Sequence, residues 1–226
     1  MQIIDLTHEI HDGMPVYPGD PVPAIRGALT HEEDYCHVDE LRLGSHTGTH
    51  IDAPYHFLSG GSTIDAIPIE RFLGVGVVVD ASAKQDLEPI GEPELSPAAG
   101  RVQRGDFVLL RTGWDRFFGT QRYFRHPYLS AGGARFLLGL GAALVGIDAM
   151  SVDPSAADAA GTGPGAKPEE ETAYPAHDIL LGNDVLIVEN LCRLDRIPQP
   201  RGMFSFLPLK LRGSDGSPVR AVYLDP

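Results

Sequence analysis

The sequence predicts a protein of the α/β class in which at least one helix connects two strands of a sheet. Four short runs are rich in apolar and β-branched residues, as buried strands are. They lie at 75–80, 107–112, 143–148 and 185–190. The stretch 129–140 instead carries apolar residues at helical spacing, and Ser130 suits a helix N-cap. This helix leads through Gly141 into the third strand, which is the order of elements in a crossover unit.

The remaining elements are predicted from shorter patterns along the chain. Further strands are expected at 2–7, 24–29, 37–43, 203–209 and 219–224, the last two joined across a turn at 213–217. A helical turn is expected within 63–72, a loop or short helix end at 83–97, and a short helix at 177–184. The segment 155–173 is glycine-rich and then acidic, so we expect a loop there, either a lid or a solvated insertion.

Length and composition are those of an ordinary soluble globular protein. The 226 residues can bury one substantial core, and we expect a single domain over residues 1–226. The net charge of −13 disfavours nucleic acid and anionic membranes as partners, because both require a basic surface. The N-terminus lacks the features of a signal peptide, and no apolar stretch reaches membrane-spanning length. We therefore expect a cytoplasmic protein.

The two cysteines do not form a disulfide framework. Cys36 and Cys192 are far apart and neither belongs to a CxxC pair, so a reducing compartment is the simplest assumption. A nucleophilic role for either thiol stays open, although an incidental or buried cysteine is the preferred interpretation.

A histidine-rich stretch at 44–56 is the part of the chain with the clearest chemical pattern. It places three histidines and one carboxylate at even positions: His46, His50, Asp52 and His56. Because successive side chains of an extended segment point to opposite faces, these four would share one side. A helix would also bring the first two together, but Gly48, Pro54 and two threonines disfavour it. We expect a short extended segment running into a turn, with all four side chains in one pocket.

These residue types predict a metal site. Neutral imidazole and carboxylate are ligands of zinc, manganese and iron, and a catalytic metal needs three protein ligands with one position left open. The alternative is a surface loop that is merely rich in histidine. That alternative explains one or two of the nine histidines, but it explains poorly three in phase with an aspartate. His31 and His37, which flank the acidic turn 32–34, are instead expected to be solvated.

Four other residues are candidates for the pocket, each with a plainer alternative. Tyr17 lies in a proline-studded loop that could hold an aromatic ring in place, or it could pack on the core. Trp114, just past a strand end, could line the pocket or simply pack. Asp148 and Asp153 lie at or beyond a strand end, where functional groups of α/β sheets often lie. A capping or turn role is the alternative for both, and it is preferred for Asp153.

The segment 46–56, HTGTHIDAPYH, closely resembles the HxGTHxDxPxH signature of the cyclase family, which contains bacterial kynurenine formamidases and isatin hydrolases. The likeness extends to 15–20, 111–114, 145–148, 151–153 and 218–221. No GxGxxG, Walker or GxSxG motif points to another class. The resemblance implies a single-domain swivelling β/β/α fold, with a mixed sheet and few helices, and assembly as a homodimer or homotetramer.

The resemblance also implies a set of site residues. It makes His46, His50 and Asp52 the ligands of one divalent metal, with zinc expected first and manganese as the alternative. It lets Asp52 bridge to a second metal completed by His177 and Glu189, so that each subunit holds one or two metals. A carboxylate at the end of an apolar strand, where Glu189 lies, is costly unless it is paired or metal-bound, which supports this assignment independently.

The implied activity is that of an arylformamidase that cleaves N-formyl-L-kynurenine to L-kynurenine and formate in tryptophan catabolism. In it the metal activates water and His56 moves the proton as general acid and base. Kynurenine formamidases carry a tryptophan where Tyr17 stands, so the small-molecule substrate is the open point. One alternative is an isatin hydrolase-like enzyme for cyclic amides or lactones. Another is a metal-binding protein without catalysis, which would have no need of His56.

Overall fold

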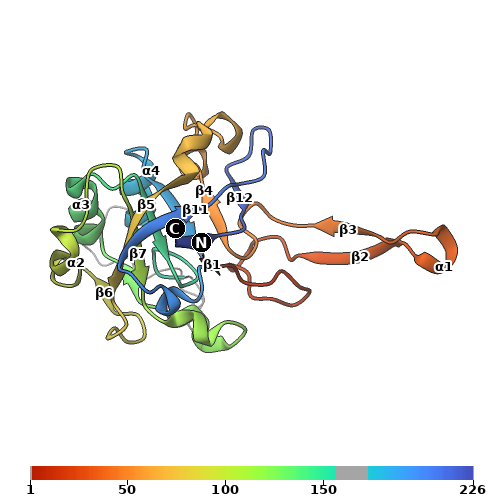
Figure 1. Cartoon of the computed structure of the whole chain (residues 1–226), viewed down its shortest axis with the longest axis horizontal. Coiled ribbons are helices and arrows are strands. Elements are labelled where there is room, and N and C mark those ends of the chain that lie inside the picture. Colours follow the sequence, from red (N-terminus) through yellow and green to blue (C-terminus); the bar gives the residue numbers. More distant parts are fainter. Residues whose placement is uncertain (1, 156–172, 226) are drawn as a thin grey trace.

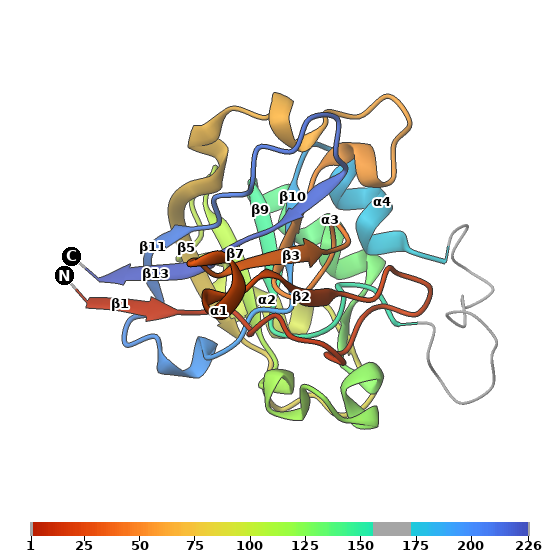
Figure 2. The same cartoon turned by 90° about the vertical axis from the view of Figure 1, so that its right-hand side faces the viewer.

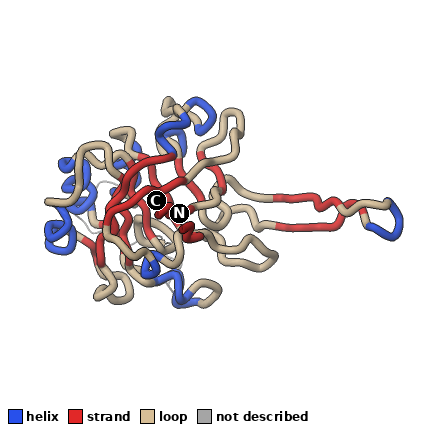
Figure 3. Tube along the Cα trace, in the orientation of Figure 1, coloured by secondary structure: helices blue, strands red, loops and turns tan. Residues whose placement is uncertain are grey.

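The computed structural model describes residues 2–155 and 173–225, and its frame is a nine-stranded mixed sheet (Figures 1 and 3). Its strand order is β1-β13-β11-β5-β7-β9-β10-β4-β12. The four central strands run parallel: β5 (Leu73–Asp80), β7 (Phe107–Arg111), β9 (Leu144–Ile147) and β10 (Leu186–Glu189). Antiparallel strands continue the sheet on both sides: β11 (Arg201–Ser205), β13 (Val222–Asp225) and β1 (Gln2–Asp5) on one, β4 (His50–Asp52) and β12 (Gly216–Pro218) on the other.

The central strands are buried on both faces, which explains their unbroken apolar sequences. In β7, Val108 and Leu110 face a core beneath the helices, while Phe107 and Leu109 face a second core on the other side of the sheet. The helices α2 (Glu92–Ala99), α3 (Ala131–Leu140) and α4 (Pro175–Leu181) cover the first face (Figure 1). The four central strands expected from the sequence are thus confirmed.

The predicted helix after Ser130 is also confirmed. The Ser130 hydroxyl accepts a hydrogen bond from the Gly133 N–H at 3.0 Å, and α3 ends at Gly141, whose φ of 81° is a left-handed conformation that favours glycine. The expectation for 83–97 is wrong in part, because α2 is a full helix that extends beyond it. Its first turn contains Pro93, which is tolerated there, and the Glu94 carboxylate accepts from the Gly91 N–H at 2.8 Å.

The C-terminal segment differs most from its prediction. β11 and β13 do pair, but the segment between them is not a simple turn. It crosses to the far edge of the sheet and forms β12, which pairs with β4 so that Gly216 lies opposite Asp52. A Cβ at Gly216 would lie 2.7 Å from the Ile51 carbonyl oxygen, so only glycine permits this approach. The crossing brings residues near 215 beside the histidine-rich segment.

A hairpin projects away from the sheet and forms an arm (Figure 1), which points towards the viewer in Figure 2. The arm consists of β2 (Ala24–Leu29), α1 (His31–Asp34) and β3 (Val38–Arg42), and every residue of β3 is exposed. His31 and His37 are exposed as predicted.

Smaller elements complete the described structure. β6 (Pro89–Ile90) pairs in parallel with β8 (Tyr128–Leu129). Six 3-10 turns connect the larger elements: η1 (Pro54–His56), η2 (Ile64–Ala66), η3 (Ile69–Phe72), η4 (Trp114–Phe117), η5 (Gln121–Arg125) and η6 (Leu194–Arg196). Cys36 is exposed, Cys192 is buried, and both thiols are free. Within 2–155 and 173–225, no helix has the length and apolar character needed to cross a membrane. Apart from its two end residues, the loop predicted over 155–173 lies outside the described residues.

Candidate metal centre

The structure brings the four residues of the histidine-rich segment together, but not by a continuous extended segment. Only β4 is a strand, and it places His50 and Asp52 on one face. His46 precedes it in a turn that includes Gly48, at φ 65°. His56 ends the 3-10 turn η1, which Pro54 begins. The even spacing therefore predicted the convergence, although turns rather than strand alternation position the two outer histidines.

The first group of candidate ligands lies around one oxygen of Asp52. The Asp52 Oδ1 atom is 2.8 Å from His46 Nδ1 and 3.3 Å from His50 Nε2. The other ring nitrogen of His50, Nδ1, lies 2.8 Å from the Gly48 carbonyl oxygen and donates to it. That hydrogen bond leaves Nε2 as the nitrogen with the lone pair, directed towards Asp52. One ligand atom from each of the three residues lies within 4.8 Å of the others.

The second group lies around the other oxygen of Asp52, and all three of its residues are buried. His177 Nε2 is 3.7 Å from Asp52 Oδ2 and 3.4 Å from Glu189 Oε1. The His177 Nδ1 atom donates to Asp153 Oδ2 at 2.7 Å, which again leaves Nε2 as the lone-pair nitrogen. α4 carries His177 and β10 carries Glu189. The two side chains meet where β10, the last of the parallel strands, pairs with β4. The structure thus brings together all five residues predicted as metal ligands.

A divalent cation fits these two groups. Among the described residues, the Asp52 Oδ2 atom is buried and has no hydrogen-bond partner, which is costly for a carboxylate. A cation between Asp52, His177 and Glu189 would remove that cost. The donor set of imidazole nitrogens and carboxylate oxygens suits a divalent metal without selecting one.

The electrostatics of the groups lead to the same conclusion. Burial disfavours the charged form of His46, but the attraction of Asp52 and hydrogen bonds to Asp215 and Asp52 outweigh it and raise its pKa to about 10. Burial likewise opposes the charge of His177, but its hydrogen bond to Asp153 and the nearby negative charges of Asp52 and Glu189 raise its pKa well above the ordinary value. In the metal-free chain, protons on these histidines balance the carboxylates. A divalent metal supplies that positive charge instead, so its binding would release the protons.

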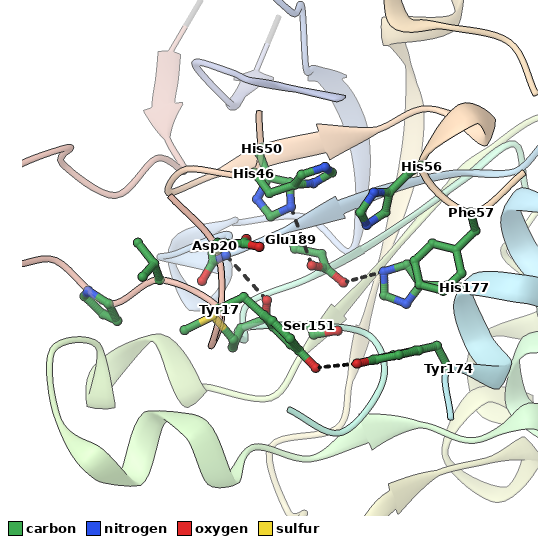
Figure 4. Close-up of a pocket in the computed structure, with 14 residues that line it drawn as sticks. Tyr17, Asp20, His46, His50, His56, Phe57, Ser151, Tyr174, His177 and Glu189 are labelled. Carbon is green, nitrogen blue, oxygen red and sulfur yellow. Dashed lines mark hydrogen bonds and ion pairs between the residues drawn. The ribbon is translucent and has the colours of Figure 1, made fainter. Parts of the chain in front are cut away.

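A cavity of about 300 Å³ opens over both groups (Figure 4). His56 and the aromatic side chains Tyr17, Phe57 and Tyr174 line it together with every candidate ligand except Asp52, which lies buried beneath it. The Phe57 ring stacks on His177 with 4.6 Å between ring centroids, and the Tyr17 hydroxyl donates to the Tyr174 hydroxyl at 3.3 Å. Tyr17 is therefore a residue of the cavity, although it also packs against the core beneath the helices.

Two other candidates are structural. Trp114 is fully buried in the core, so its packing alternative is correct. Asp148 is also buried, and its carboxylate accepts from the Thr112 N–H, the Thr112 hydroxyl and the Gly113 N–H, which ties the end of β9 to that of β7. Neither residue lines the cavity.

Two carboxylates next to the ligands have contacts that the sequence did not predict. Asp153 accepts from the Ala176 and His177 N–H groups at 2.9 Å, so the preferred capping role is right, yet the same carboxylate also holds the His177 ring. Asp215 was expected in a turn, but its Oδ2 atom lies 2.9 Å from His46 Nε2 and 3.1 Å from His56 Nδ1. No local pattern marks either role, since the contacts span at least 24 residues of sequence.

The fold and site define an α/β protein with a cluster of histidine and carboxylate side chains that suits a divalent metal, and comparisons with known proteins narrow this class. Residues 4–154 match the model of the Cyclase family, described as "Putative cyclase". The chain is 32% identical over 222 residues to a kynurenine formamidase of Bacillus cereus, covering 97% of this chain and 95% of the relative. It is 33% identical over 233 residues to a kynurenine formamidase of Salinibacter ruber, covering 100% and 98%.

Solved structures show the same fold. Isatin hydrolase A from Labrenzia aggregata, bound to benzyl benzoate, aligns with a TM-score of 0.86 at 27% identity, covering 98% of this chain and 93% of that one. A predicted metal-dependent hydrolase from Bacillus stearothermophilus aligns with a TM-score of 0.76 at 28% identity, covering 98% and 97%. The chain belongs to the cyclase family. The α/β fold that this family resemblance implied, a mixed sheet with few helices, is confirmed.

Proposed function

We propose that this chain is a metal-dependent hydrolase of carbon–nitrogen bonds, specifically an arylformamidase that converts N-formyl-L-kynurenine to L-kynurenine and formate in tryptophan catabolism. One observation carries the proposal. Two groups of imidazole and carboxylate ligands share Asp52 beneath a cavity lined by aromatic rings. Kynurenine formamidases that are 32–33% identical over nearly the full chain support the choice of substrate.

The metal half of the proposal assigns the ligands. His46, His50 and Asp52 hold one divalent ion, and Asp52, His177 and Glu189 hold a second if two are bound. Zinc is the first choice and manganese the alternative, because imidazole and carboxylate accept both. Bound there, the metal supplies Lewis-acid activation of water and of the substrate carbonyl.

His56 supplies the proton transfer. Its Nδ1 atom is 3.1 Å from Asp215 Oδ2, which leaves Nε2 to exchange a proton in the cavity. In formamide hydrolysis, His56 takes a proton from water as the formyl carbon is attacked, then returns it to the departing aniline nitrogen. Glu189 also lines the cavity, but it is not assigned as the general base because it belongs to the second ligand group.

The aromatic side chains bind the aryl ring of the substrate. Tyr17 and Tyr174 approach each other at their hydroxyls, and Phe57 is fixed by its stacking on His177. Aromatic rings prefer offset or edge-to-face partners, so an aryl formamide gains contact with Tyr17 and Phe57 as it reaches the metal groups.

A second candidate is hydrolysis of a cyclic amide such as isatin, or of a lactone. Two observations favour it: the TM-score of 0.86 to isatin hydrolase A, and a tyrosine at position 17 instead of the tryptophan of kynurenine formamidases. A non-catalytic metal-binding protein is the third candidate. His56 argues against it, because a structural site needs no titratable group beyond its ligands.

The first test is turnover of N-formyl-L-kynurenine and of isatin by protein loaded with zinc, loaded with manganese, or treated with chelator. Fast, chelator-sensitive release of kynurenine supports the arylformamidase, whereas turnover of isatin alone moves the proposal to cyclic amides. Absence of both activities in metal-loaded protein would contradict both enzyme proposals. His56→Ala is expected to keep its metal and lose about 10²–10⁴-fold in kcat. Full activity of that variant would exclude His56 from the reaction.

We also propose that the chain is a cytoplasmic, single-domain enzyme over residues 1–226 that acts as a homodimer or homotetramer without nucleic acid or membrane partners. The arm supports an oligomer, because a two-stranded hairpin alone is marginally stable in water and this one exposes Leu41 and Val38. Light scattering after size exclusion measures the mass directly. A monomer at micromolar concentration would contradict the proposal.

A further inference from the structure

Asp215 reaches the metal centre from a remote part of the chain. It precedes β12, and its carbonyl oxygen accepts from the Ala53 N–H at 2.9 Å, directly after the ligand strand β4. The next residue, Gly216, pairs with Asp52 across the sheet. A Cβ at Gly216 would lie 3.0 Å from the His46 Cε1 atom, so the turn packs tightly against this ring. The backbone therefore fixes Asp215 against the two histidines.

One oxygen of Asp215 contacts both of these rings. Its Oδ2 atom is 2.9 Å from His46 Nε2 and 3.1 Å from His56 Nδ1, and the two ring centroids are 4.0 Å apart. The other nitrogen of His46, Nδ1, faces Asp52 Oδ1 at 2.8 Å. His46 thus lies between a candidate metal ligand and Asp215, and His56 lies between Asp215 and the cavity.

A carboxylate that accepts from one imidazole N–H decides which nitrogen keeps the lone pair and where that nitrogen points. We propose that Asp215 is a positioning residue that orients the metal ligand His46 and the proton carrier His56 together. Held at Nε2, His46 presents Nδ1 to the metal. Held at Nδ1, His56 presents Nε2 to the substrate. The His56 half of this inference rests on the proposed function, whereas the His46 half rests on metal binding alone.

The test compares four proteins: wild type, Asp215→Ala, His56→Ala and the double variant. Zinc affinity is measured by competition with a chromogenic chelator, and kcat and KM are measured at saturating zinc. Asp215→Ala is expected to weaken zinc binding about 10–100-fold, with or without His56, because it acts there through His46. At saturating zinc it is expected to lower kcat about 10–100-fold with KM within about threefold. In the His56→Ala background it should cause no further loss of kcat, because the residue it orients is gone.

Asp39→Ala is the matched control. Asp39 also accepts from a histidine, with its Oδ1 atom 3.1 Å from His37 Nε2, but this pair lies exposed on the arm. The control should change neither zinc affinity nor kcat. Asp215→Asn, which keeps an acceptor oxygen and the side-chain shape, should recover part of both losses and guards against misfolding of the alanine variant.

Three results would overturn the inference. They are unchanged zinc affinity and kcat in Asp215→Ala, a loss of kcat that multiplies with that of His56→Ala, and equal effects of Asp39→Ala. If wild-type protein hydrolyses neither substrate, the proposed function fails. The zinc affinities of the Asp215 and Asp39 variants then still decide whether Asp215 orients His46.

Discussion

Two histidine–aspartate pairs with the same spacing lie 13 residues apart in this chain and have opposite fates: His37 with Asp39, and His50 with Asp52. In the arm, the His37 and Asp39 side chains are 51% and 41% exposed, with 3.1 Å between Nε2 and Oδ1. In the metal centre, the His50 and Asp52 side chains are 4% and 0% exposed, with 3.3 Å between Nε2 and Oδ1. The pair distance is nearly the same, and only the surroundings differ.

Because both pairs have the same residue types, the difference shows that burial is what makes the second pair a candidate metal site. β3 has one neighbouring strand and water around it, so its pair is a surface interaction worth at most about 1 kcal/mol. β4 is enclosed by β10 and β12, so Asp52 cannot be hydrated and needs a partner for each oxygen. That need is what a cation meets. Mutations of matched residues in the two regions therefore test the comparison.

The largest effect is expected from Asp52→Asn. The amide removes the negative charge shared by both ligand groups, so metal content should fall below half of the wild-type value. Turnover should fall on the order of 10³-fold or more, towards the level of the chelated enzyme. Asp39→Asn on the arm should leave both unchanged. Metal analysis by mass spectrometry and initial rates measure the two quantities. A metal-replete, active Asp52→Asn protein would contradict the difference proposed between the two pairs.

A smaller effect is expected from His126, a buried histidine outside the metal centre. Burial lowers its pKa to about 4, and its Nε2 atom has no hydrogen-bond partner among the described residues. As the pH falls below about 6.5, His126 therefore takes up a proton in the unfolded chain but stays neutral in the folded chain. Neutral His126 thus contributes to the free energy of unfolding above that pH. This contribution of up to about 3 kcal/mol is lost as the pH falls to 4.

Urea unfolding of metal-free protein at pH 7.5 and 5.0 measures this loss. Wild type should lose more of its free energy of unfolding between the two values than His126→Gln does, because glutamine does not titrate. His37→Gln, at an exposed position, should keep the wild-type difference. The interpretation would be wrong if His126→Gln and His37→Gln had the same pH dependence.

The smallest effect is expected from Tyr17→Trp, which installs the residue of kynurenine formamidases in the cavity. The ratio of kcat/KM for N-formyl-L-kynurenine to that for isatin should rise by up to about tenfold, since the change alters aromatic contact rather than chemistry. Tyr35→Trp is the control, because Tyr35 is 95% exposed on the arm. A ratio that falls in Tyr17→Trp would mean that Tyr17 does not discriminate between these substrates as proposed.

The part of the site that the sequence predicts is the part encoded locally. His46 to His56 are close in sequence, so spacing alone indicated that they meet, and the family resemblance added His177 and Glu189. The carboxylates behind them, Asp153 and Asp215, follow from tertiary contacts across 24 and 169 residues, which no periodicity records. The central strands were predictable because burial on both faces leaves an apolar run. β12 was not, because its three residues, Gly216–Pro218, form a strand only through pairing with β4.

The pairing of β1 with β13 has a consequence for the chain as a whole. Gln2 lies opposite Asp225 in the antiparallel register, so the two ends of the described chain are neighbours at one edge of the sheet (Figure 1). Because these ends lie on paired strands, a short glycine linker could join them. New ends could then be opened at the tip of the arm, which would give a circular permutant with the metal centre untouched.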